Sequence, residues 1–449
     1  MYLRVKHPPV AFDQYRPLIS SQLADELTLL ASQLGHLRFV HINSTATGGG
    51  VAEILQSMVP LMNSLGIATE RVVIEPPPEF FLVTKRIHNM LQGAKGSLSH
   101  DELKIYYQSI EDVAQEFRRD QLEADVWLLH DPQLLPLAHL LPRNSHTPWL
   151  WIAHIDFTSP NQEVLERLLP LTADYDQLIF SLDSYVPEAI TGNPPVCIAP
   201  PAIDPLTVKN TPLSESQAQE IVAALGIDPA RPLMTQVSRF DAWKDPCGVV
   251  DAFRLARQSV PGLQLALLGF SQATDDPESL EVLNSVIEHA DGDPDIHTYF
   301  YTDGLPTSVD LAVNAFQVAS QVVIQKSLRE GFGLTVAEAI WKGKAVIGGN
   351  VGGIRIQIED GVSGYLVDSV EECAMRVVQL VQDPALRDRL GEAARASVAS
   401  RFLLPRLALD WLKATQACIG RADNGNGHDV EALRGLRTLN PARPLSPST

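Results

Sequence analysis

Residues 37–65 read LRFVHINSTATGGGVAEILQSMVPLMNSL. The stretch begins with an apolar run over Leu37–Ile42, passes through the glycine-rich segment Asn43–Gly50, and continues as Val51–Leu65 with apolar residues three and four positions apart. Such a succession is typical of a buried strand that leads through a short loop into an amphipathic helix. The stretch therefore predicts one βα unit of an α/β fold.

The same alternation of short apolar runs and longer helical patterns recurs along most of the chain. Strands that are apolar on both faces and alternate with helices indicate parallel sheets, and hence doubly wound α/β units. Helical patterns begin near Gly248, Asp310, Leu334 and Glu371. The expected strands are Leu37–Ile42, Thr69–Ile74, Val126–His130, Trp149–His154 and Gln177–Phe180, then Leu233–Val237, Leu263–Leu268, Val322–Gln325 and Ala345–Ile347.

A proline-rich segment divides the chain into two such units. Residues 199–212, APPAIDPLTVKNTP, contain four prolines, which interrupt both helices and strand ladders. We expect two Rossmann-like domains, over residues 1–204 and 205–404, that face each other across a cleft at the carboxyl ends of both sheets. A terminal helix over 405–418 is expected to pack back on the first domain, and a flexible tail rich in Gly, Asn, Pro and Ser follows over 421–449.

Composition excludes several classes of protein. The 449 residues include 35 Lys and Arg against 54 Asp and Glu, and this net charge of −19 argues against a non-specific nucleic-acid binder but not against a small anionic ligand. The four cysteines lie far apart, which disfavours a zinc ribbon or a disulfide scaffold. No uncharged stretch approaches the roughly 20 apolar residues that span a bilayer, and the N-terminus lacks the apolar core of a signal peptide. We therefore expect a soluble cytoplasmic protein.

The triple glycine is the first candidate ligand site. Without β-carbons, the backbone at Gly49 and Gly50 can approach a ligand closely, and the start of the following helix offers unpaired N–H groups to a phosphate. The alternative is a tight turn with no ligand. The segment matches neither a Walker loop nor a Gly-x-Gly-x-x-Gly motif. Three consecutive glycines exceed what a turn needs, so we favour contact with a phosphate or a sugar.

Two cations follow the strand at Leu233–Val237. Arg239 and Lys244 lie five positions apart at its carboxyl end, where the Arg fork and the compact Lys charge can converge on a diphosphate. The alternative is that both are solvated surface residues.

A third motif, QKSLREGFGLTVAEA over residues 325–339, follows another strand. Glu330 lies in its loop and Glu338 on the second turn of the expected helix, so the two carboxylates suit different hydroxyl groups of one ligand rather than a shared proton. The alternatives for Glu330 are an ion pair with Arg329 or a helix cap, and neither accounts for two glycines around a phenylalanine. The helix start offers an anion site at the backbone N–H groups of Gly331, Phe332, Gly333, Leu334 and Thr335.

Together these motifs resemble the retaining, nucleotide-sugar-dependent glycosyltransferases with two Rossmann domains, the GT-B architecture. Within that superfamily the chain is similar to the trehalose glycosyltransferring synthases, with retaining trehalose phosphorylases as close relatives. The resemblance runs from about residue 37 to 412. It rests on Asn43-Ser-Thr…Gly-Gly-Gly-Val-Ala-Glu, His130-Asp-Pro-Gln133, His154-Ile-Asp156, Ile203-Asp-Pro-Leu, Val237-Ser-Arg-Phe-Asp and Arg329-Glu-Gly-Phe-Gly-Leu-Thr-Val.

The resemblance implies reversible transfer of glucose from a nucleoside-diphosphate glucose to free glucose, which forms trehalose with retained configuration. The leaving diphosphate would accept the acceptor's proton on the same face of the sugar; a covalent carboxylate intermediate is the alternative, and no residue identifies it. On the donor side, Arg239 and Lys244 would bind the diphosphate, and Gly49 and Gly50 would approach it from the opposite domain. Glu330 would bind the glucose hydroxyls, and His154 would bind the primary hydroxyl of that glucose. Glu338 would bind the ribose of the nucleotide. On the acceptor side, Asp131, Gln133 and Asp156 would line the pocket, and His130 would only shape its wall.

We expect no metal ion and no cofactor besides the nucleotide sugar. The Asp291-Gly-Asp293 triplet imitates a metal-binding Asp-x-Asp, but its Gly- and Pro-rich surroundings indicate a turn with solvated acids. Arg239 and Lys244 can do the work of a metal cation on the leaving diphosphate.

Several alternatives stay open at the level of sequence. One is a trehalose phosphorylase that uses phosphate, and another is the same donor chemistry with a different small acceptor, such as glycerate or glycerol. A regulator that binds a sugar nucleotide without turnover, or a non-hydrolysing epimerase, is a third. The expected partners are small molecules, with neither nucleic acid nor a membrane span. The sequence does not identify the base of the nucleotide or the favoured direction of the reaction. It also does not show whether the chain forms a homodimer.

Overall fold

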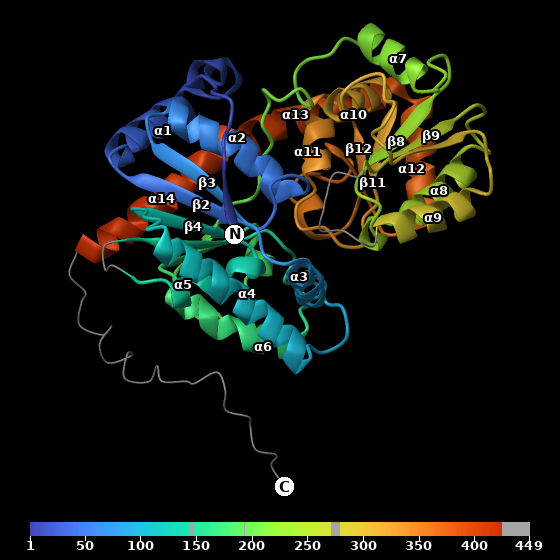
Figure 1. The fold of residues 1–449 in the computed structure, drawn as a ribbon. Helices are drawn as coiled ribbons and strands as arrows, with labels where there is room; N and C mark the ends of the chain where they lie inside the picture. The colour runs from blue at the N-terminus through green and yellow to red at the C-terminus, as the bar shows by residue number, and fades with distance from the viewer. Residues whose placement is uncertain (144–146, 193, 271–278, 424–449) are drawn as a thin grey trace.

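The computed structural model of the protein describes residues 1–143, 147–192, 194–270 and 279–423. These residues form two α/β units, each built around one sheet with helices on both faces (Figure 1). The terminal helix extends to Asp423, further than expected, and the rest of the tail expected over 421–449 lies outside the described residues. Within the described ranges, no helix combines the length and the apolar character needed to cross a bilayer.

The first sheet has the strand order β1-β3-β2-β4-β5-β6-β7. All neighbouring pairs are parallel except β1 and β3, which are antiparallel. The five strands expected from sequence are present, and β1 and β7 at the two edges were missed. The strands are β1 (Tyr2–Val5), β2 (Arg38–Asn43), β3 (Ala68–Ile74), β4 (Val126–His130), β5 (Trp149–Ala153), β6 (Gln177–Phe180) and β7 (Val196–Ile198).

The second sheet is parallel throughout, with the order β10-β9-β8-β11-β12-β13. The four expected strands are the central ones, and the edge strands β10 and β13 were missed. The strands are β8 (Leu233–Val237), β9 (Gln264–Leu268), β10 (Ile296–Tyr299), β11 (Val322–Gln325), β12 (Val346–Gly349) and β13 (Gly364–Val367).

Helices cover both faces of each sheet (Figure 1). The first sheet carries α1 (Ser21–Leu34), α2 (Gly50–Ser64) and α14 (Leu404–Asp423) on one face, and α3 (Pro78–Leu91), α4 (His100–Arg119), α5 (Leu137–Leu140) and α6 (Gln162–Leu168) on the other. The second carries α8 (Pro246–Ala256), α9 (Ser279–Ala290) and α12 (Val370–Gln382) on one face, and α7 (Glu215–Ala224), α10 (Val309–Ala319), α11 (Leu334–Trp341) and α13 (Pro384–Arg401) on the other.

Successive residues along a strand are buried on opposite faces of the sheet, against different layers of helices. Phe39 and Leu128 are buried with α1, α2 and α14, whereas the next residues, Val40 and Leu129, are buried with α3 and α4. This alternation follows from the pleat of a strand, which points successive side chains to opposite faces. Because both layers are apolar, the central strands read as continuous apolar runs.

The chain crosses between the two units twice, and the two crossings lie side by side. The backbone N–H of Ile203 donates to the carbonyl of Phe402 at 2.9 Å, and that of Leu404 donates to the carbonyl of Ile203 at 2.9 Å. After the second crossing, α14 packs on α1 and α2, where Trp411 is buried in the core of the first unit.

Candidate active site

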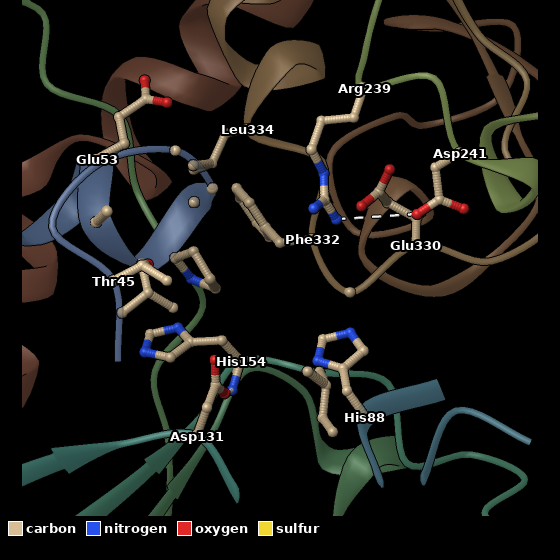
Figure 2. A pocket seen from close by; sticks show the side chains of 18 of the residues that line it. Thr45, Glu53, His88, Asp131, His154, Arg239, Asp241, Glu330, Phe332 and Leu334 are labelled. Atoms are coloured by element: carbon tan, nitrogen blue, oxygen red, sulfur yellow. Dashed lines mark hydrogen bonds and ion pairs between the residues drawn. The ribbon is translucent and has the colours of Figure 1, made fainter. Parts of the chain in front are cut away.

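A cavity of about 370 Å³ lies between the two units. Loops at the carboxyl ends of β2, β4 and β5 line it together with α3 on one side, and loops after β8 and β11 line it on the other. Figure 2 shows Asp131, His154 and His88 on the side of the first unit, opposite Arg239, Asp241 and Glu330 of the second. This is the edge of the sheets at which parallel α/β folds bind their ligands.

The triple glycine forms the wall at the start of α2. Gly48 and Gly49 have φ angles of 75° and 81°, in the left-handed region that favours glycine, and Gly49 precedes the helix without a side-chain cap. A Cβ on Gly50 would lie 3.2 Å from Cδ1 of Leu334 on the opposite unit. The first N–H groups of α2 therefore lie close to the start of α11, with both helix ends at the cavity.

Close backbone contacts hold the loop before α11 against the first unit. A Cβ on Gly331 would lie 2.7 Å from the carbonyl oxygen of His154, so only glycine fits at this close contact between the two units. The hydroxyl of Tyr185 donates to the carbonyls of Glu330 at 2.8 Å and of Gly331 at 3.0 Å. Gly333 starts α11 with φ of 85°. The expected anion site, Gly331 to Thr335, thus lines the cavity.

Arg239 and Lys244 both reach the cavity, as the sequence predicts. The ammonium of Lys244 lies 2.7 Å from Oε2 of Glu330, which also accepts a hydrogen bond from Ser327 at 3.2 Å. The guanidinium of Arg239 lies 3.8 Å from Asp241 and is 37% exposed. Glu330 therefore pairs with Lys244 and not with Arg329, and the cations are not simply solvated surface residues.

Asp131 and His154 form the floor of the cavity on the first unit. Oδ1 of Asp131 accepts a hydrogen bond from the backbone N–H of His154 at 2.7 Å. Asp131 has φ of 65° and ψ of 171°, a conformation that is almost exclusive to glycine. Burial raises the pKa of Asp131 to about 7. Gln133 also lines the cavity, and its buried Oε1 has no hydrogen-bond partner among the described residues.

Two of the predicted site residues do not line the cavity. Asp156 is buried and accepts hydrogen bonds from the backbone N–H of Thr158 at 2.8 Å and from its hydroxyl, so it stabilises its own turn. Glu338 is completely buried beneath the start of α11, 3.4 Å from the ammonium of Lys209. Neither carboxylate oxygen of Glu338 has a hydrogen-bond partner in the described part of the chain. The ribose role for Glu338 and the acceptor role for Asp156 stay predictions.

Arg71 was not predicted from the sequence, and its side chain holds the glycine-rich loop at Asn43–Gly50 in place. Its buried guanidinium donates to Oδ1 of Asn43 at 3.0 Å and to the carbonyls of Thr45 at 2.7 Å and Ala46 at 3.0 Å. Burial lowers the pKa of Arg71 to about 10, which still leaves it charged at neutral pH. Because these partners are neutral oxygens, the charge adds to the positive potential of the loop. No local pattern singles it out, since it lies within the apolar strand β3.

A polar face of α3 was missed as well. Lys85, His88, Asn89 and Gln92 line the cavity and recur three and four positions apart, which is the spacing of one helical face and was visible in the sequence. Burial, followed by the nearby charge of Lys85, lowers the pKa of His88 to about 3. This neutral imidazole and the two amides give α3 groups that can hydrogen-bond sugar hydroxyls.

The Asp291-Gly-Asp293 triplet lies away from the cavity. It forms a turn, as expected, with Asp291 at φ of 53°. The expectation of solvated acids is wrong for Asp293, because its carboxylate is 10% exposed and lies 2.6 Å from the guanidinium of Arg257. In the described ranges, no three His, Cys, Asp or Glu side chains gather where they could bind a metal ion together.

Models of two protein families match the chain. "Trehalose synthase, N-terminal domain" matches residues 41–187, and "Glycosyl transferases group 1" matches residues 217–397. The trehalose synthase of Rubrobacter xylanophilus is 41% identical over 94% of this chain and its own full length, and that of Pyrococcus horikoshii is 41% identical over 88% of this chain and 93% of its own. A trehalose phosphorylase of Pleurotus pulmonarius is 27% identical, and the match covers 89% of this chain but 60% of that protein.

Solved structures of sugar transferases share the architecture. Sucrose-phosphate synthase from Thermosynechococcus elongatus matches with a TM-score of 0.66 and 16% identity, over 86% of this chain and 99% of its own. A trehalose-phosphate synthase from Burkholderia xenovorans, solved with glucose-6-phosphate, matches with a TM-score of 0.66 and 12% identity, over 85% of this chain and all of its own. These likenesses show the fold, which is GT-B. With sequence identity to trehalose synthases along almost its whole length, the chain belongs to the trehalose synthase family of glycosyltransferases.

Proposed function

We propose that the protein transfers glucose from a nucleoside-diphosphate glucose to free glucose and forms trehalose, with retention at the anomeric carbon. The main support for this proposal is that two cations and two helix N-termini lie at one cavity. Arg239 and Lys244 reach it from the second unit, and α2 and α11 begin at it without side-chain caps. A diphosphate has the charge and the oxygen atoms that such an arrangement binds.

The same groups would stabilise the charge that develops as the sugar–phosphate bond breaks. The Lys244 ammonium is held 2.7 Å from Glu330, so its position is fixed before a ligand arrives, and preorganised charge of this kind lowers a barrier most effectively. On the opposite wall, Asp131, Gln133 and the polar face of α3 offer hydrogen-bonding groups for a sugar acceptor. In the proposed mechanism, the leaving diphosphate accepts the acceptor's proton on the face that it vacates.

Product analysis with a panel of nucleotide sugars tests the proposal. Purified protein is incubated with glucose and, separately, with uridine, adenosine or guanosine diphosphate glucose, and the products are separated by anion exchange and gas chromatography. We expect trehalose and the free nucleoside diphosphate from at least one donor. Donor hydrolysis without disaccharide, or a product with another acceptor, would contradict the proposal. A parallel incubation of trehalose with inorganic phosphate identifies the phosphorylase alternative by release of glucose 1-phosphate.

A further inference from the structure

Three histidines form a hydrogen-bonded chain from the cavity into the core of the first unit. Nδ1 of His41 lies 3.0 Å from Nε2 of His130, and Nδ1 of His130 lies 3.0 Å from Nε2 of His154. Neighbouring rings are stacked, with centroids 5.3 Å apart in both pairs. Trp411 of α14 lies beside the inner two rings, with centroid distances of 5.4 Å to His41 and 5.5 Å to His130. His154 and His130 line the cavity, whereas His41 is completely buried.

The strand pattern places the three rings on one face of the sheet. His41, His130 and His154 each follow an apolar residue two positions earlier, on the neighbouring strands β2, β4 and β5. Those earlier residues are packed in the layer under α14, so the histidines continue that layer toward the cavity. His41 and His130 thus lie on strands, and His154 directly follows the last residue of β5, so the sheet positions all three rings.

All three rings are neutral at pH 7. Burial lowers the pKa of His41 to about 3, that of His154 to about 4, and that of His130 well below its ordinary value. A neutral imidazole has one N–H donor and one bare nitrogen acceptor. Three neutral rings joined through two hydrogen bonds can therefore adopt only two proton patterns, with every proton on Nδ1 or every proton on Nε2.

The inner end of the chain decides between the two patterns. Nε2 of His41 is buried and has no hydrogen-bond partner among the described residues. Because an unpaired buried N–H group is rarer than an unpaired buried acceptor, this favours an Nε2 without a proton. Arg71 on β3 is the register partner of His41 on β2, and β3 lies on the side of β2 away from β4, so the cation lies at this inner end. A positive charge there favours the pattern whose protons lie nearer the cavity, which is the pattern with protons on Nδ1.

We propose that His41 and His130 are positioning residues that hold His154 with its proton on Nδ1, so that His154 offers the cavity a hydrogen-bond donor. The use of that donor rests on the proposed function, because it suits an oxygen atom of the donor substrate. The tautomer itself does not depend on the reaction. A free neutral histidine prefers the other tautomer, with its proton on Nε2, so without the chain His154 would present a bare Nδ1 to the cavity in most molecules.

Nuclear magnetic resonance of protein labelled with ¹⁵N at histidine reads the tautomers directly, without any ligand. Two-bond ¹⁵N–¹H correlations distinguish a proton on Nδ1 from one on Nε2, and the loss of signals in His41→Asn, His130→Asn and His154→Asn assigns the three rings. We expect Nδ1–H in all three. An Nε2–H on His154 overturns the proposal, whether or not the protein forms trehalose.

Kinetics of His41 variants test whether the chain reaches the reaction. His41→Leu fills the space but removes the inner donor, and we expect kcat to fall about fivefold, the effect of one neutral hydrogen bond. His41→Asn keeps an N–H near the position of Nδ1 and should restore most of this loss. Trp411→Phe keeps a ring beside the chain and should leave kcat unchanged. A folded His41→Leu with unchanged kcat contradicts the positioning role. If His41→Leu does not fold, the tautomer of His154 in the unaltered protein decides by NMR, and Nε2–H there overturns the proposal.

Discussion

Asp131 combines a strained backbone with a buried carboxyl group at the cavity floor. Its φ of 65° and ψ of 171° lie in a region that costs a residue other than glycine about 1–3 kcal/mol. Its carboxylate accepts the backbone N–H of His154, and burial raises its pKa to about 7. Strained backbone and a buried carboxyl group of this kind are typical of functional sites, and the place of Asp131 in the acceptor pocket stays a prediction.

Asp131→Gly should separate stability from activity. Glycine adopts the observed conformation freely, and this relief offsets the lost hydrogen bond, so we expect the melting temperature to change by only a few degrees. If Asp131 binds the acceptor as predicted, trehalose formation should fall by about 100-fold, because the acceptor would lose its carboxylate partner. Calorimetry and product assays measure the two effects. Asp291→Gly is the matched control, since Asp291 also has positive φ but lies away from the cavity, and it should keep full activity. An active Asp131→Gly contradicts the role.

The free energy of unfolding of His41→Asn should differ from that of the original protein by an amount that depends on pH. His41 has a pKa of about 3 in the fold, where burial, Arg71 and His7 lower it, against about 6.5 when unfolded. Below pH 6.5 the unfolded chain binds a proton that the folded protein does not, so this group's stabilisation is lost as pH falls. Urea unfolding should show the advantage of the original protein over His41→Asn shrinking by about 2 kcal/mol between pH 7 and pH 5. A constant difference would mean that His41 is not held neutral.

Between elements, Lys209 joins α2 of the first unit to α11 of the second. Its ammonium lies 2.7 Å from Oε1 of Glu53 on α2 and 3.4 Å from Oε1 of Glu338 on α11. Burial raises the pKa of Glu338, whereas the charges of Glu338 and Glu53 raise the pKa of Lys209 even though burial opposes this. Lys209, on the segment between the two units, and Lys342, directly after α11, therefore supply positive charge beside the buried Glu338.

Lys209→Met should destabilise the protein by about 3 kcal/mol, because it leaves the buried Glu338 with only Lys342 as a nearby cation, and burial lowers the pKa of that ammonium to about 7. Adding Glu338→Gln in that background should recover part of the loss, since it removes the charge that is left uncompensated. Denaturant unfolding of both single variants and the double variant gives the coupling free energy between them. Additive losses would show that the two side chains do not depend on each other.

Gly331→Ala should reduce transfer while both units keep their cores. The added methyl would lie 2.7 Å from the carbonyl oxygen of His154, so the loop before α11 must move away from the first unit. We expect kcat/KM to fall at least about tenfold, because both walls of the cavity are displaced. Far-UV circular dichroism should stay unchanged. Gly420→Ala, where nothing lies within 4 Å of the added carbon, is the control and should behave like the original protein.

The two units share one chain that crosses between them twice. The paired crossings at Ile203 and Phe402 and the return of α14 onto the first sheet fix where the two sheets meet. The cavity lies where their carboxyl ends face each other, so the site is a property of the assembled pair of units.

The central strands and most cavity loops could be predicted from sequence, because each has a local signal. Buried parallel strands such as β4 and β6 are apolar throughout, and their bounds agree with the expected ones. The edge strands β1 and β10 are only half-buried and polar in part, so they lack that signal. Glu338 was placed correctly on the second turn of its helix, yet local sequence does not show that Lys209 covers it. Arg71 was missed for the same reason, since its role arises from packing.

The fate of a labelled anomeric carbon tests whether this cavity transfers glucose from a nucleotide sugar with retention. Nucleoside-diphosphate α-glucose labelled with ¹³C at C1 is mixed with unlabelled glucose and the protein, and the anomeric signals are followed by NMR. We predict that the label appears in one ring of α,α-trehalose, with one nucleoside diphosphate released for each trehalose formed, and that Lys244→Met and Arg239→Met almost abolish the signal. A β-linked product, label released as free glucose, or normal turnover in both variants would contradict retaining transfer at this site.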